Sequence, residues 1–180
     1  MGKIVSSFFI SLDGVVEAPD KWHFPYYNEE MQAAVGKGFE TTEAMLMGRV
    51  LYEEWAGYWP TSQDEPIASL FNSMPKFVVS HSLREASWNN TTIIGGDVAA
   101  GLRDLKATSE GDITMSGSAT LVRWLLANHL LDQLNLLVHP IAVGRGQHLF
   151  EDTPTHPLRL LSHETFSTGV LNLAYAPADS

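Results

Sequence analysis

Residues 112–143 (DITMSGSATLVRWLLANHLLDQLNLLVHPIAV) constrain the fold of this chain more than any other stretch. An apolar run at 113–115 meets the small residues 116–118, an amphipathic segment follows at 119–130, and a second apolar run spans 134–143. This order predicts a strand, a tight turn, a helix and a second strand. Unpaired backbone N–H groups at such a helix start, together with the helix dipole, can bind an anion, whereas a plain serine cap is the alternative.

The rest of the chain continues this alternation of strands and helices. Strands are predicted at residues 3–11, 44–48, 76–80, 91–94, 158–166 and 170–176, and helices at 29–41, 49–58, 66–74 and 98–106. Asn28 and Asp97 stand where N-caps are expected, and the turn Ser167-Thr168-Gly169 predicts a closing hairpin. We therefore expect one α/β domain over residues 1–180, with a mostly parallel central sheet flanked by helices on both faces and an antiparallel C-terminal hairpin.

Composition and charge exclude several classes of function. The chain has no cysteine, which excludes disulfides, cysteine metal sites and thiol catalysis, and which favours a cytoplasmic location. Its formal charge of −10 argues against nucleic-acid binding, and no apolar segment is long enough to cross a membrane. The seven histidines form no i,i+4 pair, so no metal site is expected.

Three predicted strand ends collect small or polar residues. These are Gly48-Arg49, Ser80-His81-Ser82 and Ser116-Gly117-Ser118. Ligands of parallel sheets bind beyond the carboxyl ends of the strands. The three ends together therefore predict an anion-binding site, whereas Arg103 and Arg123 are expected to be solvated residues on helix faces.

The same strand ends carry a resemblance to a known family. The motifs, in chain order, are Ser11-Leu12-Asp13-Gly14, Met47-Gly48-Arg49 with Tyr52, Val79-Ser80, the run from Ser116 to Leu121, Leu131-Asp132-Gln133-Leu134, and Pro140 with Gly144-Arg145-Gly146 and Leu149-Phe150. In this order and spacing the chain resembles the reductase domain at the C-terminus of the bifunctional riboflavin-biosynthesis deaminase-reductase, and its stand-alone relatives. More distantly, it is similar to dihydrofolate reductase.

The resemblance implies a dihydrofolate reductase-like fold, NADPH as cofactor, and hydride transfer to a small pyrimidine- or pterin-like heterocycle. It implies a cofactor site whose residues are Gly48 and Arg49 on the phosphates, Ser80, His81 and Ser82 towards the adenosine 2′-phosphate, and Ser116, Gly117, Ser118, Ala119 and Thr120 around the pyrophosphate. It also implies a homodimer, formed through the final strands.

The sequence departs from the family at several positions. Ser118 replaces a second glycine at the pyrophosphate turn, and Leu51 stands where dihydrofolate reductases have a threonine. Val15-Val16-Glu17 replaces the Lys-x-Ala continuation of the riboflavin-pathway reductases, and Gln32 lies near the position of the acid that grips a pterin ring. The identity of the heterocycle therefore stays open.

Asp13 is the acid that we expect first as proton donor, because it ends the first strand beside the predicted crevice. A turn-forming aspartate before Gly14 is the alternative, and Glu17, Asp20 and His23 are weaker candidates. The aromatic residues expected to line a substrate pocket are Trp22, Phe24, Tyr52 and Trp55, with core packing as the alternative.

Two other functions remain open at this stage. The chain could be an NADP(H)-binding module of this fold without turnover, which the departures at Ser118 and Leu51 would explain. A serine hydrolase using Ser116 or Ser118 is the other, although the chain lacks a G-x-S-x-G motif.

Overall fold

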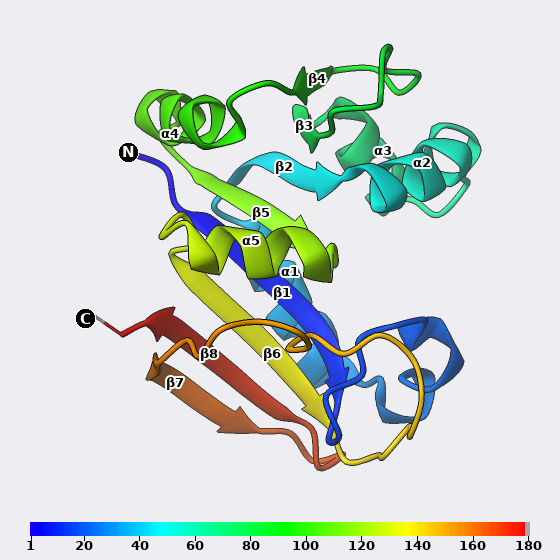
Figure 1. The fold of residues 1–180 in the computed structure, drawn as a ribbon. Helices are drawn as coiled ribbons and strands as arrows, with labels where there is room; N and C mark the ends of the chain where they lie inside the picture. Colours follow the sequence, from blue (N-terminus) through cyan, green and yellow to red (C-terminus); the bar gives the residue numbers. More distant parts are fainter. Residues whose placement is uncertain (179–180) are drawn as a thin grey trace.

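The computed structural model describes residues 1–178, in which eight strands form one sheet (Figure 1). The strands are β1 (Ile4–Ser11), β2 (Thr42–Gly48), β3 (Lys76–Val79), β4 (Thr91–Ile94), β5 (Asp112–Ser116), β6 (Gln133–His139), β7 (Leu158–Thr165) and β8 (Leu171–Pro177). Their order is β4-β3-β2-β5-β1-β6-β8-β7. The first six are parallel, and β8 pairs antiparallel with both β6 and β7. The predicted α/β architecture with an antiparallel C-terminal hairpin is confirmed.

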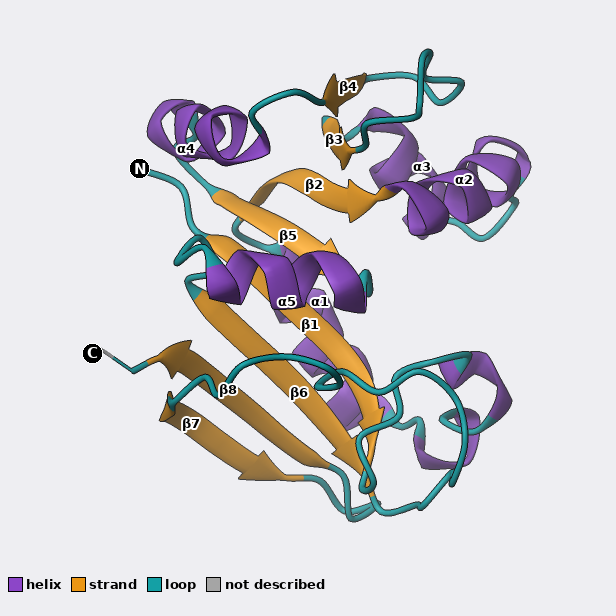
Figure 2. Cartoon of the chain, viewed as in Figure 1, coloured by secondary structure: helices purple, strands orange, loops and turns teal. Residues whose placement is uncertain are grey.

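Helices cover both faces of the sheet (Figure 2). They are α1 (Glu29–Phe39), α2 (Arg49–Tyr58), α3 (Ile67–Ser73), α4 (Val98–Thr108) and α5 (Ala119–Ala127). Apolar residues of α4 and α5 share one buried cluster with β1, β5 and β6, whereas Met31 of α1 packs on the opposite face with Leu137, Phe166 and Val170. None of these helices is long and apolar enough to span a membrane.

Both predicted N-caps are confirmed, because Asn28 and Asp97 accept hydrogen bonds from Met31 N and Ala100 N. The prediction for the helix α5 was too long by three residues. The helix stops at Ala127, where the Asn128 side chain donates to Trp124 O at 2.8 Å and His129 takes a positive φ of 55°.

The strand β6 ends at His139, four residues before the predicted end. Leu12 N donates to Ile141 O, and the N–H groups of Val143 and Gly144 donate to the Asp13 carboxylate. Backbone groups that would continue a strand therefore bind the loop after β1.

The side chain of Lys76, at the start of β3, is fully buried. Its ammonium group donates to Phe71 O and Met74 O, both at 2.7 Å, and lies 4.4 Å from the centre of the Trp88 ring. Burial lowers the pKa of Lys76 to about 8, so the group is still protonated at neutral pH. Lys76 thus ties the end of α3 to the sheet.

The outer strand β7 exposes apolar side chains. Leu160 and Leu161 are 46% and 44% exposed. The homodimer implied by the family resemblance stays a prediction, and this edge of the sheet is where we expect it to form.

Candidate functional site

A cavity of about 1570 Å³ lies along the carboxyl edge of the parallel strands. It is lined by Gly48 and Arg49 after β2, His81 after β3, Asp97 after β4 and the turn 116–118 after β5. The strand ends that the sequence singled out therefore do meet in one place, as the geometry of parallel sheets requires.

Two helices begin at this cavity without a side-chain cap. The helix α2 follows Gly48 and α5 follows Ser118, and in neither does a side chain accept from the first N–H groups. These N–H groups have no partner within their own helix, so both helix starts are available to an anion. Ser118 Oγ accepts from Gly48 N at 3.0 Å and joins the two helix starts.

Ser118 holds an unfavourable backbone conformation for a residue with a side chain. Gly117 has φ +94°, and Ser118 has φ +61° and ψ +54°, in the left-handed region. A non-glycine residue there costs about 1–2 kcal/mol. The hydroxyl bond to Gly48 N offsets part of this cost, which explains how serine replaces the second glycine of the family pattern.

This balance predicts different stabilities for two variants of Ser118. Ser118→Gly loses the bond but also loses the strain, so its free energy of unfolding should stay close to that of the wild type. Ser118→Ala loses the bond and keeps the strain, and should be less stable by about 1 kcal/mol. Urea unfolding measures both, and equal stabilities for the two variants would contradict the strain.

Arg49 stands at the mouth of the cavity. Its Nη1 donates to Glu53 Oε2 at 2.7 Å, one turn along α2, and its side chain is 44% exposed. Its other guanidinium N–H groups have no partner among the described residues 1–178 and can bind a phosphate in a planar geometry.

The three residues expected at the adenosine 2′-phosphate differ in their surroundings. Ser80 is buried, and its Oγ accepts from the N–H groups of Ser82 and Leu83, so it holds the turn after β3. His81 lines the cavity, whereas Ser82 does not. Asp97, which the sequence marked only as a helix cap, lies at the same end of the cavity.

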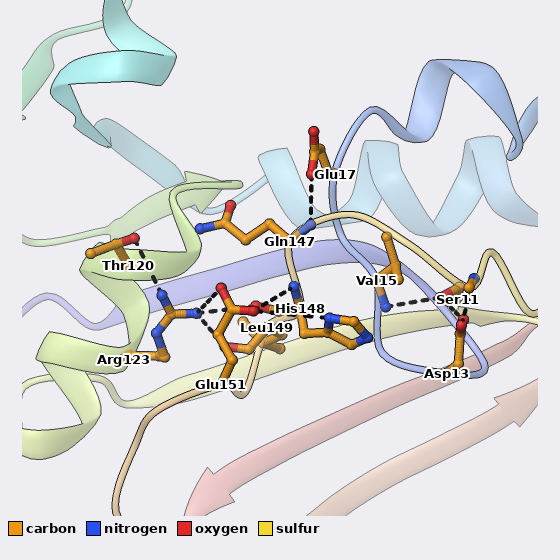
Figure 3. A network of polar contacts seen from close by, with 11 residues as sticks. Ser11, Asp13, Val15, Glu17, Thr120, Arg123, Gln147, His148, Leu149 and Glu151 are labelled. Carbon is orange, nitrogen blue, oxygen red and sulfur yellow. Dashed lines mark hydrogen bonds and ion pairs between the residues drawn. The ribbon is translucent and has the colours of Figure 1, made fainter.

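The structure does not support Asp13 as a proton donor. Its carboxylate accepts from Ser11 Oγ at 2.5 Å (Figure 3). It also accepts from the backbone N–H groups of Val143 and Gly144. The bond from Ser11 and then these N–H groups lower the pKa of Asp13 to about 2, and the residue does not line the cavity. The carboxylate is ionised at neutral pH and fastens the loop after β6 to the loop after β1.

Of the four aromatic residues predicted for the substrate pocket, Trp55 lines the cavity. Tyr52 is a core residue with 1% exposure, and its hydroxyl accepts from Trp88 N. Trp22 is buried and donates from Nε1 to Glu17 O, whereas Phe24 is 61% exposed. Tyr52 and Trp55 lie three residues apart on one face of α2 and share an apolar cluster, and of the two Trp55 also borders the cavity.

His23 belongs to a buried histidine pair behind the cavity. Its ring stacks on Phe9 at 4.5 Å and lies 6.0 Å from the ring of His139. His139 Nδ1 bonds Leu137 O, but His139 Nε2 and His23 Nδ1 have no hydrogen-bond partner within residues 1–178. Burial lowers the pKa of both groups, and repulsion between them lowers that of His23 further.

This pair predicts a loss of stability in acid. Both imidazoles stay neutral in the folded protein to a lower pH than in the unfolded chain, where they titrate near about 6.5. Below that pH the unfolded chain binds more protons, so the free energy of unfolding should fall until the folded pKa values are passed. His23→Phe keeps a ring stacked on Phe9 and should make the free energy of unfolding depend less on pH between neutral pH and the onset of carboxylate titration. Urea unfolding at a series of pH values measures this dependence. An unchanged dependence on pH would contradict the role of the pair.

Several residues of the cavity lining were not predicted from the sequence. Phe8 and Phe9 of β1, Trp124 of α5 and Gln147 all line it. The first three read as core positions, and no pattern distinguishes them. Gln147 follows directly on Gly144-Arg145-Gly146, a motif that could have drawn attention to it.

Comparison with known proteins agrees with this architecture. The chain matches the family described as "RibD C-terminal domain" over residues 2–172. It is 25% identical to an uncharacterized protein of Bacillus subtilis (strain 168), YyaP, in an alignment covering 96% of this chain and 94% of that protein.

Solved structures share the fold at low sequence identity. A putative riboflavin biosynthesis protein from Shewanella sp. PV-4 superposes with a TM-score of 0.80 at 18% identity, covering 98% of this chain and 99% of that one. Dihydrofolate reductase from Enterococcus faecalis, solved with NADP(H), gives a TM-score of 0.66 at 13% identity over 99% and 98% of the two chains. A deaminase/reductase from Thermotoga maritima gives 0.69 at 13% identity, with 98% of this chain matching 57% of that longer protein. These structures show the fold alone. The family match over residues 2–172 supports a reductase-like role, and on that match the chain belongs to the RibD C-terminal domain family.

Proposed function

We propose that this protein is an NADPH-dependent reductase that transfers a hydride to a small pyrimidine- or pterin-like heterocycle. The observation that carries the proposal is the cavity onto which the two uncapped helix starts open, joined by the bond from Gly48 N to Ser118 Oγ. The family match and the NADP(H) complex of the Enterococcus faecalis reductase support the choice of cofactor.

The described residues fit a dinucleotide phosphate. The N–H groups after Gly48 and Ser118 and the Arg49 guanidinium offer donors to phosphate oxygens. Gly117 has φ +94°, a conformation that favours glycine, and without a side chain its backbone is open to a phosphate at this turn. Phe8, Phe9 and Trp124 supply apolar surface where water must be excluded.

Bound NADPH would supply the hydride. The chain's own part would be to hold the phosphates at α2 and α5 and to set an electrophilic carbon of the heterocycle against the apolar wall. Because Asp13 holds no proton at neutral pH, the proton that accompanies the hydride would come from solvent or from another group at the cavity.

Titration with NADPH, followed by tryptophan fluorescence and melting temperature, tests the cofactor. Binding should raise the melting temperature in proportion to the logarithm of cofactor concentration. NADPH oxidation is then followed with dihydrofolate and with 5-amino-6-(5-phosphoribosylamino)uracil as acceptors. A folded protein that shows no response at millimolar NADPH contradicts the proposal.

The binding module without turnover is the second candidate, supported by the position of Asp13, whose carboxylate is held by Ser11, Val143 and Gly144 and does not line the cavity. NADPH binding without oxidation across a panel of heterocycles would favour it. The serine hydrolase has no support, because within residues 1–178 no histidine bonds Ser116 or Ser118, and Ser118 Oγ is occupied by Gly48 N.

A further inference from the structure

Gln147 stands where the loop after β6 reaches the cavity, and its backbone is fixed on both sides. Its N–H donates to Glu17 Oε2 at 2.6 Å (Figure 3), and its carbonyl accepts from Val16 N at 2.9 Å. Gly146 permits this contact, since it has φ +114° and a Cβ there would lie 3.1 Å from Glu17 Oε2.

The residues after Gln147 are fixed by a different element. Arg123 of α5 donates from Nη1 to His148 O and to Leu149 O, both at 3.0 Å. Leu149 N donates in turn to Gly14 O at 3.0 Å. Arg123, expected to be a solvated helix residue, therefore links the helix at the anion site to the loop that carries Gln147.

The side chain of Gln147 is half-buried, lines the cavity and extends toward Thr120, away from Asp13 (Figure 3). Among residues 1–178 its amide group has no hydrogen-bond partner. A carboxamide whose donors and acceptor are all unused, held on a rigid backbone, is pre-organised to bind a ligand group.

The order of the strands places Gln147 along the cavity. His81 and Asp97 follow β3 and β4, the turn 116–118 follows β5, and Gln147 joins the loops after β1 and β6. With phosphates at the β5 turn, a ligand lying along the sheet edge would have adenosine at the β3–β4 end. Its reacting ring would lie at the β1–β6 end, beside Phe8, Phe9 and Gln147.

We propose that the carboxamide of Gln147 pairs with a planar amide or lactam edge of the ligand at this reacting end and so determines which ring is accepted. The proposal rests on the proposed function. An amide and a lactam both offer a carbonyl next to an N–H, which a carboxamide complements with one donor and one acceptor. The nicotinamide carboxamide and the lactam of a pyrimidine or pterin share this chemistry.

Gln147→Leu keeps the size of the side chain but removes its polar atoms. Its effect on binding distinguishes pairing with the nicotinamide from pairing with the lactam of a heterocycle. Dissociation constants are measured for NADP⁺, for its fragment adenosine 2′-phosphate 5′-diphosphate, and for folate and 5-amino-6-(5-phosphoribosylamino)uracil in the presence of NADP⁺. Gln133→Leu is the matched control, because Gln133 lies at the amino-terminal end of β6 and bonds Asn135. Its affinities should equal those of the wild type.

The outcomes are distinct. A rise of about tenfold in the dissociation constant of NADP⁺, with the fragment unchanged, supports pairing with the nicotinamide. The same rise confined to a heterocycle supports pairing with its lactam. Unchanged affinities in Gln147→Leu, with normal binding by the wild type, overturn the role of Gln147. A wild type that binds neither NADP⁺ nor its fragment contradicts the proposed function instead.

Discussion

Replacing Arg49 by alanine is expected to weaken NADPH binding by about 10- to 100-fold, the loss typical of a charge-assisted hydrogen bond to phosphate. Arg49 is the first residue of α2 and lines the cavity. The protein has a net charge of −10, and the same cavity is lined by the carboxylates of Glu17, Asp20, Glu54 and Asp97. Lys21 also lines the cavity, so removing Arg49 leaves one Lys or Arg cation against these four carboxylates and makes the acidic rim more repulsive to an anionic ligand. Fluorescence titration at fixed ionic strength measures the effect.

The comparison with NADH locates the contact. If Arg49 binds near the 2′-phosphate, NADH affinity should change far less than NADPH affinity. Arg103→Ala is the control, because it removes the same charge from an exposed face of α4 outside the cavity lining. Equal losses for Arg49→Ala and Arg103→Ala would reduce the role of Arg49 to its contribution to net charge.

The largest effect on stability is expected from Lys76→Met. The substitution leaves the carbonyls of Phe71 and Met74 buried without a donor and removes the cation from the Trp88 ring. The free energy of unfolding should fall by about 3 kcal/mol. Urea unfolding measures the loss.

Lys37→Met is the matched control, since Lys37 is exposed on α1. Its free energy of unfolding should change little. If Lys76→Met lost no more stability than Lys37→Met, the carbonyls at the end of α3 would have found water or other donors. The bonds of Lys76 would then contribute nothing to the fold.

Local patterns predicted most of the fold. Periodicity and turn residues located every strand and α-helix to within a few residues. The N-caps Asn28 and Asp97 formed as expected. The predicted bounds were wrong where contacts between residues far apart in the sequence determine where an element ends. The strand β6 ends early because Asp13, more than a hundred residues away in the sequence, takes the N–H groups of Val143 and Gly144.

The site was predicted less well than the fold, for a physical reason. Strand ends can be located from the sequence, and Gly48, His81 and Gly117 do line one cavity. Whether a side chain faces that cavity depends on packing, which is why Tyr52 turned out to be core. The ionisation of Asp13 likewise depends on donors from the loop after β6, which no pattern near residue 13 contains.

The central place of β1 has a consequence for how the chain is made. Ile4 pairs with Ile113 of β5, and Val5 with Gln133 of β6, so both neighbours of β1 lie more than a hundred residues further along the sequence. Until both pair with it, an apolar strand has two open edges, which invites pairing with other nascent chains. Folding dominated by such distant partners is slow.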